Sequence, residues 1–556
     1  MRERNTTFDR QRLGAGDSSA DTYGWDTVFA ISYADVNRAI AAKKSSPTTF
    51  KQEVTDDGDK IAIEGTFGDW QVAVGGDGQN LWMDLPIPTV TLSGISSGSY
   101  TNAVASIEVK LGLIPQQGAT PSKGQQALRI AQAAHGDKTV TVREVELGEG
   151  GSKMKAGFVA MALEAWLNAN AVQFAHTFAS VDLDRELADE LKGMAWLMPT
   201  HTSYAVSDLG NAESSVFGVL SMTENREPTR LNHQVSANAI PEHARAGFLI
   251  SRERFLEKMV LPSMPALFKG ATLDDFFVGD DGASVLNSKR ITVQGLKLDD
   301  GTVVNPALDT NNLSVSVTET RLTIAFTDLH FVYSPGIDVY IQYNAENVLG
   351  IDADKRIALK LRKTTHKGAV TTSLDKQIIE IASTIAGIVI GAVIGVVVPG
   401  GAEIEEGAVT AGETAANAVI EESTALLEDV EDDVVGMAEE GVSPSKTAGI
   451  EAEGALDANS SATSKFAGWF ARNSAKIRGG LIGSTIGGAV GGIAGKIPDI
   501  LEAVANGEVK DLPTLERFAS AAVQPISWPG QSKFTLTSAA LNHSLQLGCH
   551  PGFADS

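Results

Sequence analysis

Residues 107–113 read I-E-V-K-L-G-L, and this alternation of apolar with polar or small residues decides the expected fold. Successive side chains of a β-strand point to opposite sides, so the four apolar residues share one face. The same period of two recurs at residues 61–63 and 72–74, and a glycine cluster at 75–78 follows. The pattern predicts a meander of antiparallel strands.

Further along the chain, strands and helices alternate. Residues 290–362 repeat the strand pattern. Apolar residues recur instead at helical spacing from about Asp26 to Lys44, over Met154–Ala175 and over Arg245–Leu261. The expected fold class is therefore α+β, with long antiparallel sheets.

The last third of the chain has a different pattern. Residues 381–398 and 479–495 contain no charge, and residues 401–460 between them are strongly acidic. Four residues make just over one helical turn, so a glycine at every fourth position forms a smooth ridge that lets helices approach closely. We therefore predict a glycine-ridged helical pair built on Gly387, Gly391 and Gly395, and on Gly479, Gly483, Gly487, Gly491 and Gly495.

Two interpretations of this pair remain open. A helix of eighteen residues is about 27 Å long, close to the roughly 30 Å thickness of a bilayer core, so the pair could insert into a membrane. The alternative is a buried helical hairpin. We favour the buried hairpin, because the second run is mostly glycine and small residues and would insert weakly.

The totals exclude several classes of protein. The 556 residues carry a formal charge of −24, which repels phosphate backbones and makes nucleic acid an unsuitable partner. One cysteine, Cys549, rules out an intrachain disulfide. The first fourteen residues contain no apolar segment, so we expect a cytoplasmic protein or one exported without a cleaved signal peptide.

No motif points to catalysis. Residues 94–98 match G-x-S-x-G, but the alternating residues that follow indicate a strand where a nucleophile elbow needs a helix. A hairpin loop is the better interpretation. The nine histidines form neither H-x-x-x-H nor H-E-x-x-H. We expect no enzyme, no cofactor and no metal site.

Three motifs resemble a known family. Residues 22–30 read T-Y-G-W-D-T-V-F-A and are followed by D-V-N at 35–37. F-G-D-W at 67–70 precedes M-D-L-P-I at 83–87, and L-N-H-S-L-Q-L stands at 541–547. The chain resembles the forty-seven-kilodalton and OrfX-type accessory proteins of clostridial neurotoxin gene clusters, and these are similar to the tubular lipid-binding (TULIP) superfamily.

The resemblance implies long curved antiparallel sheets wrapped around long α-helices. The glycine-ridged pair would be added in the C-terminal third. The expected organisation is a flexible start at 1–20, a TULIP-like half at 21–240, a second β-rich half at 241–377, the helical pair with its acidic connection at 378–510, and a strand-containing end at 511–556.

The resemblance also implies lipid or apolar-ligand binding in a seam between helix and sheet. An acyl chain there would gain about 0.8 kcal/mol per buried methylene, less its ordering cost. The apolar faces that we expect near the seam belong to Val28, Phe29, Val36, Ile40, Trp82, Leu85 and Ile87. The alternatives are a scaffold that binds a toxin or a sister accessory protein without lipid, and a membrane-inserting hairpin. Membrane contact is compatible with the first and the last.

Overall fold

The computed structural model describes residues 19–368 and 519–553. Within these ranges it leaves out 57, 116–123, 132–137, 184–193, 269, 294–295, 298–302, 336, 352–356, 520–521 and 533. The glycine-ridged pair and the acidic connection therefore lie outside the described residues, as do positions 1–18.

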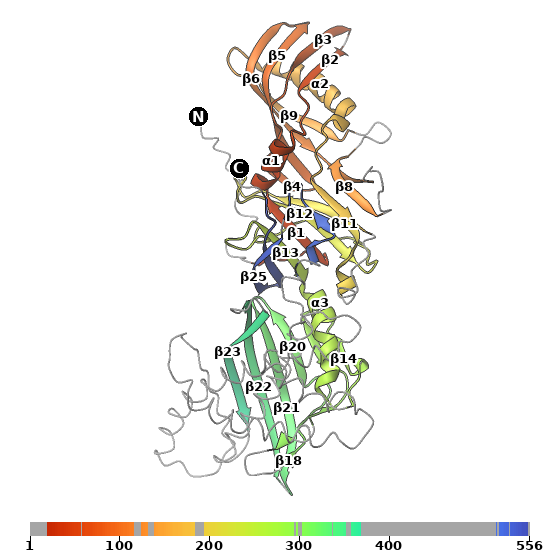
Figure 1. Ribbon diagram of the computed structural model, residues 1–556, viewed down its shortest axis with the longest axis vertical. Helices are drawn as coiled ribbons and strands as arrows, with labels where there is room; N and C mark the ends of the chain where they lie inside the picture. Colours follow the sequence, from red (N-terminus) through yellow and green to blue (C-terminus); the bar gives the residue numbers. More distant parts are fainter. Residues whose placement is uncertain are drawn as a thin grey trace, which may run out of the picture.

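The protein is elongated, with two main sheets arranged end to end along its long axis (Figure 1). The first is a 12-stranded sheet near the N-terminus. Its order is β2 (Thr49–Asp56), β3 (Asp59–Thr66), β5 (Asn80–Gly94), β4 (Gln71–Gly78), β11 (Pro199–Ser207), β12 (Val216–Thr223), β1 (Thr27–Ser32), β13 (Ala246–Ser251), β26 (Ser544–His550) and β25 (Thr535–Asn542). Strand β6 (Gly98–Val109) lies beside β5, and β9 (Val140–Glu146) lies beside β6.

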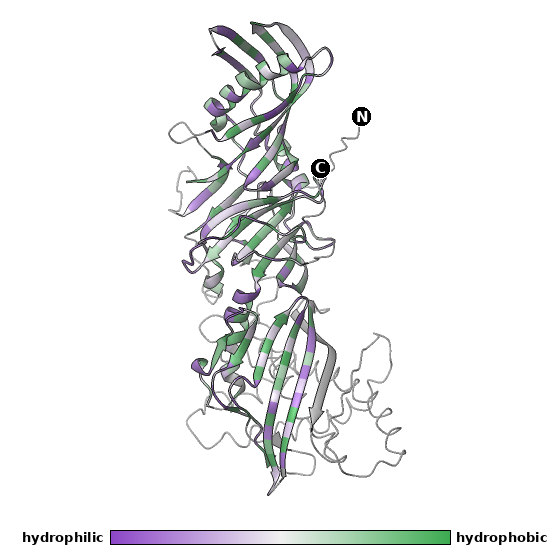
Figure 2. Cartoon of the chain, turned by 180° about the vertical axis from the view of Figure 1, so that it is seen from behind, coloured by the Kyte–Doolittle hydropathy of each residue, from purple (hydrophilic) through white to green (hydrophobic). Residues whose placement is uncertain are grey.

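The second sheet has eight strands and forms the other end of the molecule. Its order is β14 (Phe276–Val278), β15 (Ser284–Asn287), β20 (Leu313–Thr318), β21 (Arg321–Ser334), β19 (Ala307–Leu308) and β16 (Ile291–Thr292), with β22 (Ile337–Ile351) beside β21 and β23 (Ile357–Gly368) beside β22. Buried and exposed residues alternate along β21, and hydrophobic and hydrophilic residues alternate along the long strands (Figure 2).

Two small sheets complete the described strands. One has the order β24 (Ile526–Ser527), β10 (Ala179–Asp182), β8 (Gln125–Ile130) and β7 (Leu111–Pro115), and the other pairs β17 (Leu296–Lys297) with β18 (Val303–Val304). All the described strand pairs are antiparallel, as the alternation predicted. Residues 107–113 themselves belong to two strands: residues 107–109 end β6, and residues 111–113 begin β7.

The helix predicted from Asp26 to Lys44 is wrong in its first third. Residues Thr27–Ser32 form β1 between β12 and β13, and α1 follows at Tyr33–Lys43. Two neighbouring strands supply hydrogen bonds on both sides of β1, and both of its faces are buried, so tertiary pairing overrides the helical period. The Ser32 side chain then accepts a hydrogen bond from Asp35 N and caps α1.

The helix predicted over Arg245–Leu261 is also replaced in part by a strand. Residues Ala246–Ser251 form β13, which pairs with β1 and β26. A short helix, α3 (Arg252–Phe255), follows, and the chain continues through a π turn at Leu256–Val260 and 3₁₀ turns at Leu261–Leu267 and Leu273–Asp275. The segment predicted helical at Met154–Ala175 contains α2 (Lys153–Asn170) and a 3₁₀ turn at Ala171–Gln173.

The expectation of long helices wrapped by sheets is wrong. Among the described residues there are three α-helices, and the longest has 18 residues. Strands predominate instead, and much of the apolar core lies between strands and short helices rather than around a central long helix. The physical reason is the one seen at β1 and β13: residues with a helical period pair with neighbouring strands and lose the helix.

Candidate functional site

The predicted seam residues do not outline one open site. Five of them, Phe29, Val36, Ile40, Leu85 and Ile87, lie in the same large core cluster, and each is at most 2% exposed. Their side chains are packed against protein atoms. Whether a lipid can enter between them stays a prediction, because the structure shows these positions as filled core.

Val28 and Trp82 lie elsewhere. Val28 points to the opposite face of β1 from Phe29 and packs in a second, smaller cluster. Trp82 alternates with Leu81 and Met83 on β5, so its ring lies on the outer face of the sheet. There it covers Gly75, where an added Cβ would come within 2.2 Å of the ring, and it stacks 3.8 Å from the guanidinium of Arg143.

The solvent face of α2 is the least expected feature of this end of the molecule. A surface helix normally buries an apolar stripe and presents polar residues to water. Here Val159, Leu163 and Trp166 are buried against the sheet, yet Met154 and Met161 on the opposite side are 64% and 37% exposed. Phe158 and Ala165, on the same side of the helix, are partly buried, and Phe158 also packs against the core. Val172, in the 3₁₀ turn that follows α2, is 57% exposed.

A neighbouring loop extends this apolar surface. Ile95, in the β5–β6 hairpin, is 50% exposed. The Lys155 ammonium donates a hydrogen bond to the Ser97 carbonyl at 3.1 Å, which holds this hairpin next to the start of α2. The hairpin also shows that the G-x-S-x-G motif is a loop and not a nucleophile elbow. Gly94 ends β5 and Gly98 begins β6, so Ser96 lies in a turn between two strands.

The same end carries an open groove of about 630 Å³. Its lining is mixed, with hydroxyl groups, one ion pair and an aromatic edge. Lys51 and Glu64 form the ion pair at 3.2 Å. The residues that line it are Thr49, Phe50, Lys51, Glu64, Gly65, Thr66, Thr89, Thr91, Trp166 and Gln173.

The Tyr-Gly-Trp-Asp motif at 23–26, which leads into the internal strand β1 of the first sheet, has a structural role. Gly24 has a φ of 87°, a left-handed conformation that suits glycine. The Trp25 ring is buried, and its Nε1 donates to the carbonyl of Asn232 at 3.0 Å. The motif therefore anchors the 225–235 loop over the second core cluster.

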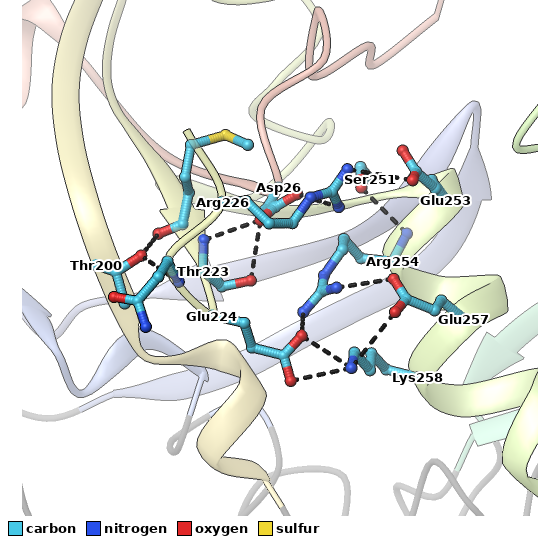
Figure 3. Close-up of polar contacts among 12 residues, drawn as sticks. Asp26, Thr200, Thr223, Glu224, Arg226, Ser251, Glu253, Arg254, Glu257 and Lys258 are labelled. Carbon is cyan, nitrogen blue, oxygen red and sulfur yellow. Dashed lines mark hydrogen bonds and ion pairs between the residues drawn. The ribbon is translucent and has the colours of Figure 1, made fainter. Parts of the chain in front are cut away.

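Asp26, the last residue of this motif, begins a polar network (Figure 3). The buried carboxylate accepts hydrogen bonds from the Thr223 amide at 2.8 Å and the Thr223 hydroxyl at 2.9 Å, and it pairs with Arg226 at 2.8 Å. Asp26 precedes β1 and Thr223 ends β12, so the network ties two neighbouring strands. Arg226 also reaches Glu253 of α3 at 3.1 Å.

Arg254 continues the network toward the second sheet. Its side chain is 1% exposed and lies between Glu224, from the turn after β12, and Glu257. Lys258 closes the arrangement with contacts to both carboxylates. Burial raises the pKa of Glu224, but hydrogen bonds from Lys258 and Arg254 outweigh it and hold that pKa below its usual value. Every carboxylate in this cluster thus faces a cation, which suits a structural junction rather than a proton-transfer site.

Other chemical sites are not evident in the described part of the chain. It contains no group of three or more metal-ligating side chains. Cys549 is buried, and burial raises the pKa of its thiol, so the reactive thiolate is disfavoured. None of its helices is long and apolar enough to cross a bilayer.

Comparison with known proteins gives the family. The model of the OrfX-like family, described as protein OrfX2/OrfX3/P47, matches residues 22–453, which include the Tyr-Gly-Trp-Asp motif. The chain belongs to the OrfX-like family. The resemblance read from the sequence motifs is thereby confirmed.

This chain aligns with only part of the length of individual OrfX-like relatives. Protein OrfX3 of Paraclostridium bifermentans is 32% identical over 288 residues, which are 47% of this chain and 58% of the relative. Protein OrfX3 of Clostridium botulinum (strain Kyoto / Type A2) is 27% identical over 310 residues, or 51% of this chain and 62% of the relative. The chain thus spans about three-fifths of the length of these relatives.

A solved structure shares the fold. P47 of Clostridium botulinum E1 aligns with 95% of this chain and 98% of its own, with a TM-score of 0.51 and 14% sequence identity. For this OrfX-like protein, the match supports the arrangement of strands.

The apolar side chains on the solvent side of α2 were missed in the sequence analysis. Their signal was present, since Met154, Phe158, Met161 and Ala165 follow helical spacing opposite the residues that would form a core face.

Proposed function

We propose that this protein is a non-catalytic binding protein for lipid or another apolar ligand. The observation that carries the proposal is the apolar solvent face of α2, together with Ile95 beside it. We define this apolar tip as Ile95, Met154, Phe158, Met161 and Val172. Met154 and Met161 of α2, with Ile95 and Val172, leave apolar side chains in water, and such side chains favour contact with an apolar partner.

The expected affinity follows from the exposed surface. Full burial of an apolar side chain contributes roughly 1.5–3 kcal/mol, so four half-exposed side chains contribute a few kcal/mol. Lys153 and Lys155 at the start of α2 would each add about 1 kcal/mol at an anionic lipid surface. Together these contributions support reversible binding at an interface. Methionine suits this role, because its flexible side chain adapts to irregular apolar partners.

The first test is lipid binding by a variant with a charged tip. Met154→Glu combined with Met161→Glu places two carboxylates on the apolar face. We expect the share of protein that co-sediments with liposomes of anionic phospholipid to fall at least about fivefold, because each carboxylate would have to leave water. Lipid extraction and native mass spectrometry of the purified wild type would detect a ligand that co-purifies.

The control variant is Val332→Glu. Val332 is 54% exposed on β21 of the second sheet, far from α2 along the chain and at the other end of the molecule. The substitution adds an acidic residue without changing the tip, so liposome binding should be retained. Wild-type protein that carries no lipid and binds no liposomes would refute the proposal.

A second candidate function is a scaffold for a toxin or a sister accessory protein, and membership of the OrfX-like family supports it. Its test is co-purification of tagged protein with the products of neighbouring genes. A stable complex formed equally well by the Met154→Glu/Met161→Glu variant would favour this function over lipid binding. A complex lost in that variant would place the protein partner on the apolar tip instead.

A further inference from the structure

Strand β2 forms one end of the 12-stranded sheet. It pairs with β3 along all eight of its residues with no register shift. In the part of the chain that the structure describes, β3 is its one strand partner. Every second residue of such an edge strand directs its N–H and C=O away from the sheet, where they can pair with another strand.

The two other terminal strands of this sheet are covered. At β9, the amides of Val140 and of Thr139 just before the strand donate to Asn168 Oδ1, and the Val142 amide donates to Glu164 Oε2 at 2.9 Å. Side chains of α2 therefore occupy the outer edge of β9. Strand β25, at the far end, packs against β22 of the second sheet.

Strand β2 also packs against α2, where the Trp166 ring lies 6.2 Å from the Phe50 ring, and the Gln52 side chain donates to the Glu53 carbonyl at 2.9 Å. Its outward N–H groups, however, have no hydrogen-bond acceptor among the described residues.

Strand β2 lacks most of the usual features that prevent edge pairing. Edge strands are commonly protected by proline, a bulge, short length or charged side chains, especially lysine, and only the charged side chains are present on β2. The sequence T-F-K-Q-E-V-T-D contains no proline, and its pairing with β3 has no bulge. Its lysine, Lys51, is paired with Glu64 at 3.2 Å.

The sequence of β2 is chemically symmetric about Gln52. Residues at equal distances on either side are complementary in an antiparallel pair. The outer face carries one pair of opposite charges and one pair of threonines, and the inner face carries one apolar pair. With Gln52 on a two-fold axis, the facing residues are Lys51 with Glu53, Phe50 with Val54, and Thr49 with Thr55.

We propose that β2 pairs antiparallel with β2 of a second copy of this chain, with a two-fold axis through Gln52. The charges support this register. Lys60 contacts Glu53 at 2.8 Å within one chain. In the dimer, charges of alternating sign would then follow one another across four strands. In order they are Glu64 on β3, Lys51 on β2, Glu53 on β2 of the second copy and Lys60 on β3 of the second copy. The pairing would join two 12-stranded sheets into one.

The test uses two charge variants, separately and mixed. Lys51→Glu places two carboxylates opposite each other in both halves of the symmetric pair, and Glu53→Lys places two ammonium groups there. We expect sedimentation velocity to show a wild-type dimer of twice the 58.4 kDa chain mass. Each variant alone should dissociate about tenfold more readily or worse. An equimolar mixture should form a heterodimer, because every facing pair then has opposite charges.

The matched control is Arg321→Glu. Arg321 pairs with Glu346 across β21 and β22 of the second sheet, so the substitution breaks a cross-strand ion pair with the same change in net charge. It should leave the dimer intact. A wild-type protein that is monomeric up to about 100 µM would overturn the proposal. A dimer that persists unchanged in both single variants would overturn it as well.

A cross-link tests the register independently of charge. Cys549 is buried, so Gln52→Cys introduces the one accessible thiol among the described residues. Two such cysteines facing each other on the axis have the Cβ spacing that a disulfide needs. Oxidation should link the chains in pairs. Thr55→Cys, which faces Thr49, should link far less, and equal linking at both positions would overturn the register.

Discussion

At the scale of the residue, His176 couples the core of the N-terminal sheet to pH. Its ring is buried among Phe174 and Phe178, and its Nδ1 lies 3.1 Å from the Ser45 hydroxyl. Burial lowers its pKa from 6.5 to about 4, and the nearby Arg129 acts in the same direction. The folded protein therefore keeps this imidazole neutral at pH values where an exposed histidine is charged.

The lowered pKa predicts a loss of stability in acid. Between pH 6.5 and about 4 the unfolded chain binds a proton at His176 that the folded chain does not, so the free energy of unfolding falls as the pH falls. The shift corresponds to roughly 3 kcal/mol at the low end of this range. In His176→Gln, chemical denaturation at pH 6.5 and pH 4.5 should show a fall smaller by about 2 kcal/mol than in the wild type.

The control for this prediction is His243→Gln. The side chain of His243 is 90% exposed, so its removal should leave the pH dependence unchanged. An identical pH dependence in His176→Gln and wild type would show that other groups govern acid unfolding.

At the scale of the element, α2 acts as the outer neighbour of β9. Asn168 accepts from two strand amides, and its own amide donates to the Val140 carbonyl at 2.8 Å. One side chain thus replaces three hydrogen bonds that another strand would make. This explains why a helix with an apolar solvent face is held in place: its buried residues pack on the sheet, and its polar residues are used to cap a strand.

Removing this cap has a local and a global consequence. In Asn168→Leu the backbone groups of Thr139 and Val140 lose their partners, which costs about 1–3 kcal/mol of stability. Hydrogen exchange should accelerate at residues 139–142, while β12 in the sheet centre stays protected. Asn170→Leu removes only local contacts, to the Trp166 carbonyl and from the Gln173 side chain, and should leave exchange at β9 unchanged.

The same element scale shows how far the sequence pattern reached. The apolar period predicted α2 to within one residue at its start and five residues at its end, because no neighbouring strand among the described residues pairs with that segment. The period failed at 27–32 and 246–251, where β1 and β13 pair with each other and with β12 and β26. Short apolar runs suit a helix or a buried strand equally, and only the neighbouring strands decide between them.

At the scale of the whole molecule, the polar network from Asp26 to Lys258 lies between the two main sheets, which form one elongated body. The large core cluster includes residues of both sheets, and Arg254 links the turn after β12 to the segment that leads into the second sheet. Figure 1 places β2 and α2 at the same end of this body. The proposed lipid binding and the proposed strand pairing therefore concern the same end, and the Lys51→Glu variant would allow lipid binding to be measured without pairing.

By itself the sequence determined the antiparallel strands, the absence of a recognisable catalytic motif and the family. These follow from period, spacing and short motifs, which are local properties of the chain. Only the tertiary structure decided that Trp82 lies on the opposite face from Leu85, that the other six predicted seam residues are packed core, and that α2 presents Met154 and Met161 to water. The reason is physical: a side chain's surroundings depend on strands distant in sequence, such as β26 beside β13, and no local pattern records those partners.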